Sequence, residues 1–165
     1  MAADFRDNVV ILTGASQGIG EQLAYQLARQ GAKLVLAARN QDRLAAVAEG
    51  CRERGAQAIV VPTDVTDETQ CKRLVERALA EFGRIDTLLN NAGKGWPRRF
   101  ENLPDLTHLR DEMNLNYFGL IYCLHYALPH LKQTRGRIVG VGSFGGLVGL
   151  PGTIGYNSSK HAMRG

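Results

Sequence analysis

An α/β fold with a doubly wound parallel sheet is predicted by three features of this sequence. Short apolar runs alternate with longer helical stretches, each run has a length that suits a strand buried on both faces, and a glycine-rich turn follows the first run. Strands that alternate with helices imply right-handed crossovers and helices on both faces of the sheet. The 165 residues are enough for one domain with a sizeable core, so a single domain over residues 1–165 is expected.

Five apolar runs are the expected strands, and four helical stretches lie between them. The strands are VVILT (9–13), KLVLAA (33–38), AIVV (58–61), TLLN (87–90) and RIVGV (137–141). The helices cover roughly 18–30, 40–54, 67–82 and 105–133. Thr66 is the expected N-cap of the third helix. A glycine ends each helix, since glycine accepts the left-handed conformation of a C′ residue; these are Gly31, Gly55, Gly83 and Gly136.

Composition and charge narrow the function classes. The net charge of +4 is mild and no long Lys/Arg run occurs, which disfavours a nucleic-acid partner. No apolar run approaches the ~18 residues of a membrane span. Three cysteines without CxxC or CxxH spacing give no sign of a metal site and fit a reducing compartment, so a cytoplasmic location is expected.

The stretch TGASQGIG (13–20) is the expected phosphate-binding turn. Glycines there would let the backbone approach a pyrophosphate at the start of the first helix, whose free N–H groups and dipole favour an anion. A carboxylate at the end of the second strand would bind the ribose 2′-hydroxyl of NAD, but Arg39 stands there instead. An arginine can pair with a 2′-phosphate, so NADP(H) is favoured over NAD(H), although Arg39 could also be an ordinary surface residue.

The stretch YNSSK (156–160) carries the expected acid–base chemistry. Tyr156 and Lys160 are four residues apart and would share one helix face, where an ammonium lowers the pKa of a tyrosine. Such a tyrosine can give a proton to a carbonyl oxygen. Ser143 follows the fifth strand, at the sheet edge where ligands bind in open α/β folds, and could hold a substrate oxygen or be a plain loop serine.

In combination, these motifs resemble the short-chain dehydrogenase/reductase family, with its Rossmann-like fold. The motifs, in family order and spacing, are TGASQGIG (13–20), DVTD (64–67), NNAG (90–93), the asparagine of MNLNYFG (113–119), the Ser143 segment and YNSSK. The resemblance implies that Tyr156 is the general acid/base, that Lys160 binds the nicotinamide ribose, that Ser143 orients the substrate and that Asn116 anchors a proton-relay water. It also implies a set of cofactor contacts: Gly14, Ser16, Gln17, Gly18, Ile19, Gly20, Asp64, Val65, Asn91, Ala92 and Gly93.

The expected function is an NADP(H)-dependent oxidoreductase that transfers hydride between nicotinamide and a ketone or secondary alcohol, in the direction of carbonyl reduction. The small apolar substrate would lie among loop residues of one sheet edge, namely Trp96, Pro97, Phe100, Phe144, Leu147 and Leu150. A homo-oligomer is expected for the full-length form. Two departures from the family pattern bear on this: position 17 is Gln rather than a basic residue, and the C-terminal part of the fold is missing after Gly165. A non-catalytic nucleotide-binding or interaction module is therefore the alternative, and a nucleotide-sugar epimerase is disfavoured by the glycine spacing.

Overall fold

A five-stranded parallel sheet forms the centre of the molecule. The computed structural model describes residues 5–165. The strands are β1 (Val9–Thr13), β2 (Lys33–Ala38), β3 (Ala58–Pro62), β4 (Thr87–Asn90) and β5 (Arg137–Gly140), and their spatial order is β3-β2-β1-β4-β5. All four strand pairs are parallel. The order reverses direction beside β1, so the sheet is doubly wound as the sequence predicts, and ligands of such sheets bind at this switch point.

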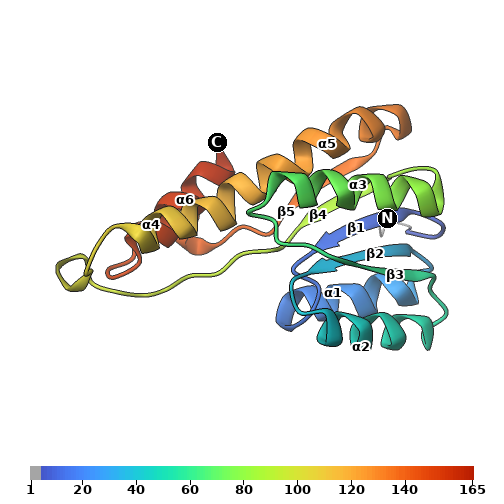
Figure 1. The fold of residues 1–165 in the computed structure, drawn as a ribbon, viewed down its shortest axis with the longest axis horizontal. Coiled ribbons are helices and arrows are strands. Elements are labelled where there is room, and N and C mark those ends of the chain that lie inside the picture. Colours follow the sequence, from blue (N-terminus) through green and yellow to red (C-terminus); the bar gives the residue numbers. More distant parts are fainter. Residues whose placement is uncertain (1–4) are drawn as a thin grey trace.

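Two helix layers cover the sheet (Figure 1). Helices α1 (Gly18–Arg29) and α2 (Gln41–Arg52) lie on one face, and α3 (Glu68–Phe82) and α5 (Gly119–Thr134) lie on the other. The five residues of β1 are all buried and alternate between the two layers. Val10 and Leu12 belong to the core under α1 and α2, whereas Val9 and Ile11 belong to the core under α3 and α5. The continuous apolar runs therefore reflect burial on both faces.

Three details differ from the sequence-based expectation. Asp67, not Thr66, caps α3, because its side chain accepts the N–H of Gln70. Arg135, not Gly136, takes the left-handed conformation after α5, with φ of 52°. The residues of β5 are exposed, because β5 is an edge strand that pairs with β4 and has little helix cover, whereas the other edge strand, β3, packs against α2.

The long fourth helix is interrupted. It consists of α4 (Thr107–Met113), a π-helical stretch (Asn114–Phe118) and α5, in direct succession. Such a π-helical stretch inserts an extra residue into the helical turn and is often associated with functional sites. Helix α4 packs against α6 (Ile154–Arg164), beyond the carboxyl ends of the strands (Figure 1). No helix among residues 5–165 is long and apolar enough to cross a membrane.

Candidate active site

The turn between β1 and α1 is tightly built. Gly14 has φ of 66°, in the left-handed region that favours glycine. Position 20 requires glycine for a different reason, which is close packing. A Cβ there would collide with the Gly14 carbonyl oxygen and lie 2.6 Å from the side-chain nitrogen of Asn91. That Asn91 nitrogen donates to the carbonyl oxygens of Thr13 (3.0 Å) and Gly14 (3.1 Å). The residue that follows β4 therefore holds the turn in place, next to the first turn of α1.

A cavity of about 410 Å³ opens above this turn. Nine of the predicted cofactor residues line it: Gly14, Ser16, Gln17, Arg39, Asp64, Val65, Asn91, Ala92 and Gly93. These residues come from the ends of β1, β2, β3 and β4, which converge at the switch point of the sheet. Gly20 does not line the cavity. It is buried beneath the turn, where it packs against Gly14 and Asn91. Gly18 and Ile19 lie on the exposed start of α1.

One lining residue of this cavity, Arg39, is positively charged. The Arg39 side chain is 71% exposed, and its guanidinium lies 3.9 Å from the Asp64 carboxylate. The other oxygen of Asp64 accepts from the backbone and side chain of Thr66, at 3.0 and 2.8 Å. Asp64 is thereby held in place and can orient Arg39 at the rim.

A second cavity, of about 330 Å³, adjoins the first. Tyr156 and Lys160 both line it, from one face of α6, together with Ile19 and Gly142. The two cavities share Asn91, Gly93 and Lys94 along their common wall. A ligand that filled the first cavity could therefore extend over the Gly93 backbone to the tyrosine and the lysine.

Lys160 is buried beside Tyr156. Its ammonium lies 5.8 Å from the centre of the Tyr156 ring and donates to the Val141 carbonyl oxygen at 2.9 Å. Burial lowers the pKa of Lys160 below its ordinary value, because a charged ammonium loses its hydration there. The structure therefore brings the predicted pair together at the end of β5.

Ser143 lies close to this pair but does not line the second cavity. Its hydroxyl accepts the N–H of Gly145 at 3.1 Å and caps a short 3₁₀ turn, Phe144–Gly146. A Cβ on Gly145 would lie 3.4 Å from the Tyr156 ring, so Ser143 is one short turn away from the tyrosine. Gly142, the residue before it, lines the cavity instead.

Asn116 lies in the π-helical stretch and is 1% exposed. Its side-chain nitrogen donates to the Lys94 carbonyl oxygen (3.0 Å) and to the Ser159 hydroxyl (2.9 Å), and its oxygen accepts the Lys94 N–H (2.9 Å). A Cβ placed on Gly93 would lie 2.9 Å from that oxygen and 3.4 Å from the Lys160 ammonium. Asn116 thus joins the loop after β4 to α6, and its oxygen faces the same small space as Lys160.

Glu112 is a buried residue beside the site that the sequence interpretation missed. It is 2% exposed, and one carboxylate oxygen accepts the backbone N–H of Trp96 at 2.7 Å. Its second oxygen lies against Gly155, next to Tyr156. The available signal was its position four residues before Asn116, on the same helix face. Lys94 was also missed, although it directly follows the NNAG motif.

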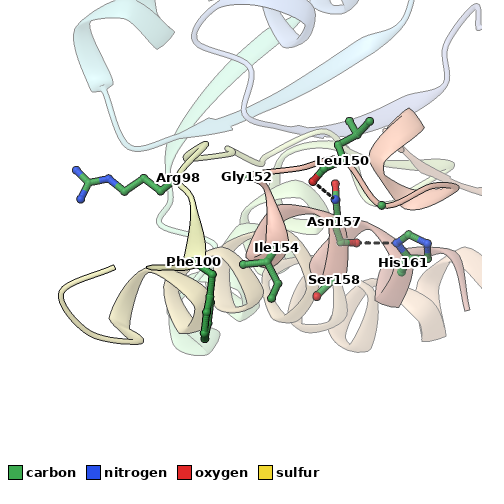
Figure 2. Close-up of a pocket in the computed structure, with 9 residues that line it drawn as sticks. Arg98, Phe100, Leu150, Gly152, Ile154, Asn157, Ser158 and His161 are labelled. Carbon is green, nitrogen blue, oxygen red and sulfur yellow. Dashed lines mark hydrogen bonds between the residues drawn. The ribbon is translucent and has the colours of Figure 1, made fainter. Parts of the chain in front are cut away.

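Only two of the six residues predicted to form the apolar substrate pocket line a common cavity. Phe100 and Leu150 line a third cavity of about 450 Å³, with Arg98, Ile154 and His161 (Figure 2). This cavity adjoins a face of α6 other than the one that bears Tyr156 and Lys160, since Asn157, Ser158 and His161 line it. The remaining four predicted residues lie elsewhere, and Phe144 and Leu147 are exposed.

Comparisons with known proteins show which family this chain resembles. The family described as short chain dehydrogenase matches residues 8–165. An Arabidopsis thaliana protein named 11-beta-hydroxysteroid dehydrogenase-like 4A is 46% identical over 94% of this chain, and an 11-beta-hydroxysteroid dehydrogenase of Pinus massoniana is 41% identical over 97%. This chain covers 52% and 45% of their lengths, so it spans about half of these curated relatives.

Solved structures give the same result. An alcohol dehydrogenase from the archaeon Thermococcus sibiricus, complexed with 5-hydroxy-NADP, superposes with a TM-score of 0.92 at 34% identity, over 96% of this chain and 68% of the other. A protein of Sinorhizobium meliloti described as a putative short-chain alcohol dehydrogenase superposes with a TM-score of 0.91 at 29% identity, over 97% of this chain and 64% of the other. The family match, together with the glycine turn, the NNAG loop and the Tyr156–Lys160 pair, shows that this chain belongs to the short-chain dehydrogenase/reductase family.

Proposed function

We propose that this chain supplies the cofactor site and the acid–base residues of an NADP(H)-dependent oxidoreductase that reduces a ketone to a secondary alcohol. The observation that carries the proposal is the shared wall of the two cavities. Tyr156 and Lys160 line one cavity, the phosphate-binding turn lines the other, and Gly93 belongs to both.

We expect the dinucleotide to bind along the residues that line the first cavity. The turn at Gly14 has no side chain between the backbone and the cavity, and the first helical turn of α1 has no side-chain cap, so its N–H groups are free for a diphosphate. Asp64 and Val65 would flank the adenine, and Arg39 would meet a 2′-phosphate. When bound, the nicotinamide supplies the hydride that reaches the carbonyl carbon.

Tyr156 is proposed to donate its phenolic proton to the carbonyl oxygen as the alcohol forms. The Lys160 ammonium would favour the resulting phenolate and hold the ribose. Ser143 would reach the substrate oxygen once its bond to the Gly145 N–H is exchanged. Asn116 would hold the relay water through the second lone pair of its side-chain oxygen, beside Lys160.

The substrate class is proposed from the relatives. The names of the plant relatives specify hydroxysteroid dehydrogenases, and the Thermococcus structure contains an NADP analogue, in line with an apolar carbonyl or alcohol and with NADP(H). A homo-oligomer and a cytoplasmic location remain predictions from the sequence.

The test compares Tyr156→Phe with the unaltered protein. NADPH oxidation would be followed with a panel of ketones that includes a steroid, and NADPH binding would be titrated by fluorescence. Turnover is expected to disappear in Tyr156→Phe while binding survives, because only the proton donor has been removed. Tyr126→Phe is the matched control, since the Tyr126 hydroxyl bonds Glu68 on the exposed side of α3. Undiminished turnover in Tyr156→Phe would refute the mechanism, and binding without turnover in the unaltered protein would favour the non-catalytic alternative.

A further inference from the structure

The ring of Tyr156 lies in a slot between two glycines. A Cβ on Gly95 would lie 2.9 Å from the Cδ2 atom and 3.4 Å from the Cε2 atom of the ring, and a Cβ on Gly145 would lie 3.4 Å from both Cδ1 and Cε1. The two glycines therefore face opposite edges of the ring. Gly95 does not have a positive φ, so glycine is required there by the contact with the ring and not by the backbone conformation.

Buried side chains of the interrupted fourth helix hold the backbone on both sides of Gly95. The carbonyl oxygen of Lys94 accepts from the side-chain nitrogen of Asn116 at 3.0 Å. The backbone N–H of Trp96 donates to one carboxylate oxygen of Glu112 at 2.7 Å. These two backbone groups belong to the peptide units that flank Gly95, one on each side. The position of Gly95 against the ring therefore depends on Glu112 as well as on Asn116.

The other oxygen of Glu112 faces the helix that carries the tyrosine. A Cβ on Gly155, in the first turn of α6, would collide with this oxygen. A carboxylate is favoured beside such a helix start, whose N–H groups carry a partial positive charge. No cationic side chain among residues 5–165 lies within 4.0 Å of the Glu112 carboxylate, so Glu112 does not form an ion pair. Its carboxylate instead joins the loop at Gly95 to α6.

We propose that Glu112 is a positioning residue for Tyr156 and that it acts by fixing Gly95 against the ring. This inference rests on the proposed function, because the direction of the phenol matters for a proton transfer. Between Gly95 and Gly145 the ring has little room to tilt, so its hydroxyl keeps one direction relative to the cavity that Tyr156 lines. A misplacement of about 1 Å can lower the rate of a reaction on the order of a hundredfold.

The test combines three variants. Glu112→Ala removes the acceptor of the Trp96 N–H, Glu112→Gln keeps an acceptor, and Gly95→Ala places a methyl group against the ring. Asp111→Ala is the matched control, because it removes the exposed carboxylate that precedes Glu112 on α4. Circular dichroism would check that each variant is folded.

Two quantities would be measured on each protein. The first is the nuclear Overhauser effect (NOE) between the Tyr156 ring protons and the α protons of residue 95, with ring-labelled tyrosine and Tyr156→Phe for assignment. The second is the pair of kcat and KM for NADPH-dependent reduction of a ketone, together with the dissociation constant of NADPH.

Glu112→Ala should weaken this NOE and lower kcat on the order of tenfold to a hundredfold, while KM and the dissociation constant of NADPH stay within about twofold. Gly95→Ala should lower kcat in the same way, because the ring has to move away from the new methyl group. Glu112→Gln should recover most of the NOE and of kcat, and Asp111→Ala should change neither.

An unchanged NOE or kcat in Glu112→Ala, or an equal loss of kcat in Glu112→Gln, would overturn the inference. An unchanged kcat in Gly95→Ala would overturn it too, so the test holds even if Glu112→Ala does not fold.

The two measurements separate this inference from the proposed function. If the unaltered protein reduces the ketone and the Glu112 and Gly95 variants match it, the inference fails and the proposed function stands. If the unaltered protein binds NADPH without turnover, the proposed function fails and the positioning role fails with it, while the NOE still decides whether Glu112 holds the ring in place.

Discussion

Gly20→Ala should destabilise the protein even though alanine is the better helix former. Gly20 lies in the first turn of α1, and an added Cβ would meet the Gly14 carbonyl oxygen, the Gly14 carbonyl carbon at 2.9 Å and the Asn91 side-chain nitrogen at 2.6 Å. Two of these atoms are backbone, so a movement of the Asn91 side chain would not relieve the clash. The turn or the helix start has to shift by about 1 Å, which is the kind of overpacking that costs about 1–3 kcal/mol.

Two further contributions set the net magnitude. The gain in helix propensity offsets about 1 kcal/mol. The shift also disturbs the two hydrogen bonds from Asn91 to Thr13 and Gly14, each worth about 1 kcal/mol. The sum is a net loss of about 3 kcal/mol, which for a chain of this size corresponds to a melting temperature lowered by about 6–12 °C.

Urea unfolding followed by circular dichroism measures this loss. Gly142→Ala is the control, because a Cβ on Gly142 would meet nothing within 4 Å, and its midpoint should match the unaltered protein. A Gly20→Ala midpoint equal to that of Gly142→Ala would refute the idea that Gly20 is needed for close packing. Loss of NADPH binding at an unchanged midpoint would show instead that Gly20 contacts the cofactor.

Two other predictions concern buried ionisable groups. Because burial lowers the pKa of Lys160 below its ordinary 10.5, the folded state binds fewer protons than the unfolded state between those two values, so stability should rise with pH across that window. Urea titrations from pH 7 to pH 10.5 should show a smaller rise in Lys160→Met than in the unaltered protein, and equal rises would contradict the lowered pKa. Glu112→Ala should cost about 1–3 kcal/mol, because it leaves the Trp96 N–H without its acceptor, whereas Glu112→Gln keeps an acceptor and should cost clearly less. Equal losses in the two Glu112 variants, measured by the same urea assay, would show that the hydrogen bond is not what this side chain contributes.

The strand pattern was readable from the sequence because it depends on local burial. Each of the five apolar runs became a strand within one residue of its predicted end, and the parallel order follows from the crossovers. The exposure of β5 was not readable, because RIVGV is as apolar as the buried runs. Both β3 and β5 are edge strands, but β3 packs against α2 and β5 has little helix cover; which helix covers a strand is a tertiary property that its own composition does not show.

The long fourth helix illustrates a second limit. Periodicity alone predicted one helix over 105–133, but the structure inserts a π-helical stretch at Asn114–Phe118. The insertion accompanies the tertiary bonds of Asn116 to Lys94 and Ser159, which come from segments 22 and 43 residues away. A local pattern carries no information about partners at that separation.

The sequence by itself determined the fold class, through the alternation of apolar runs and helices, and the places of the glycine-rich turn and of the Tyr156–Lys160 pair, which depend on residues a few positions apart. Only the tertiary structure decided which residues share a cavity: it placed Ser143 one turn away from the cavity of Tyr156, set Glu112 against α6 and brought Gly95 to Tyr156. The physical reason is that these contacts join segments which the sheet brings together, and their geometry is set by packing between layers.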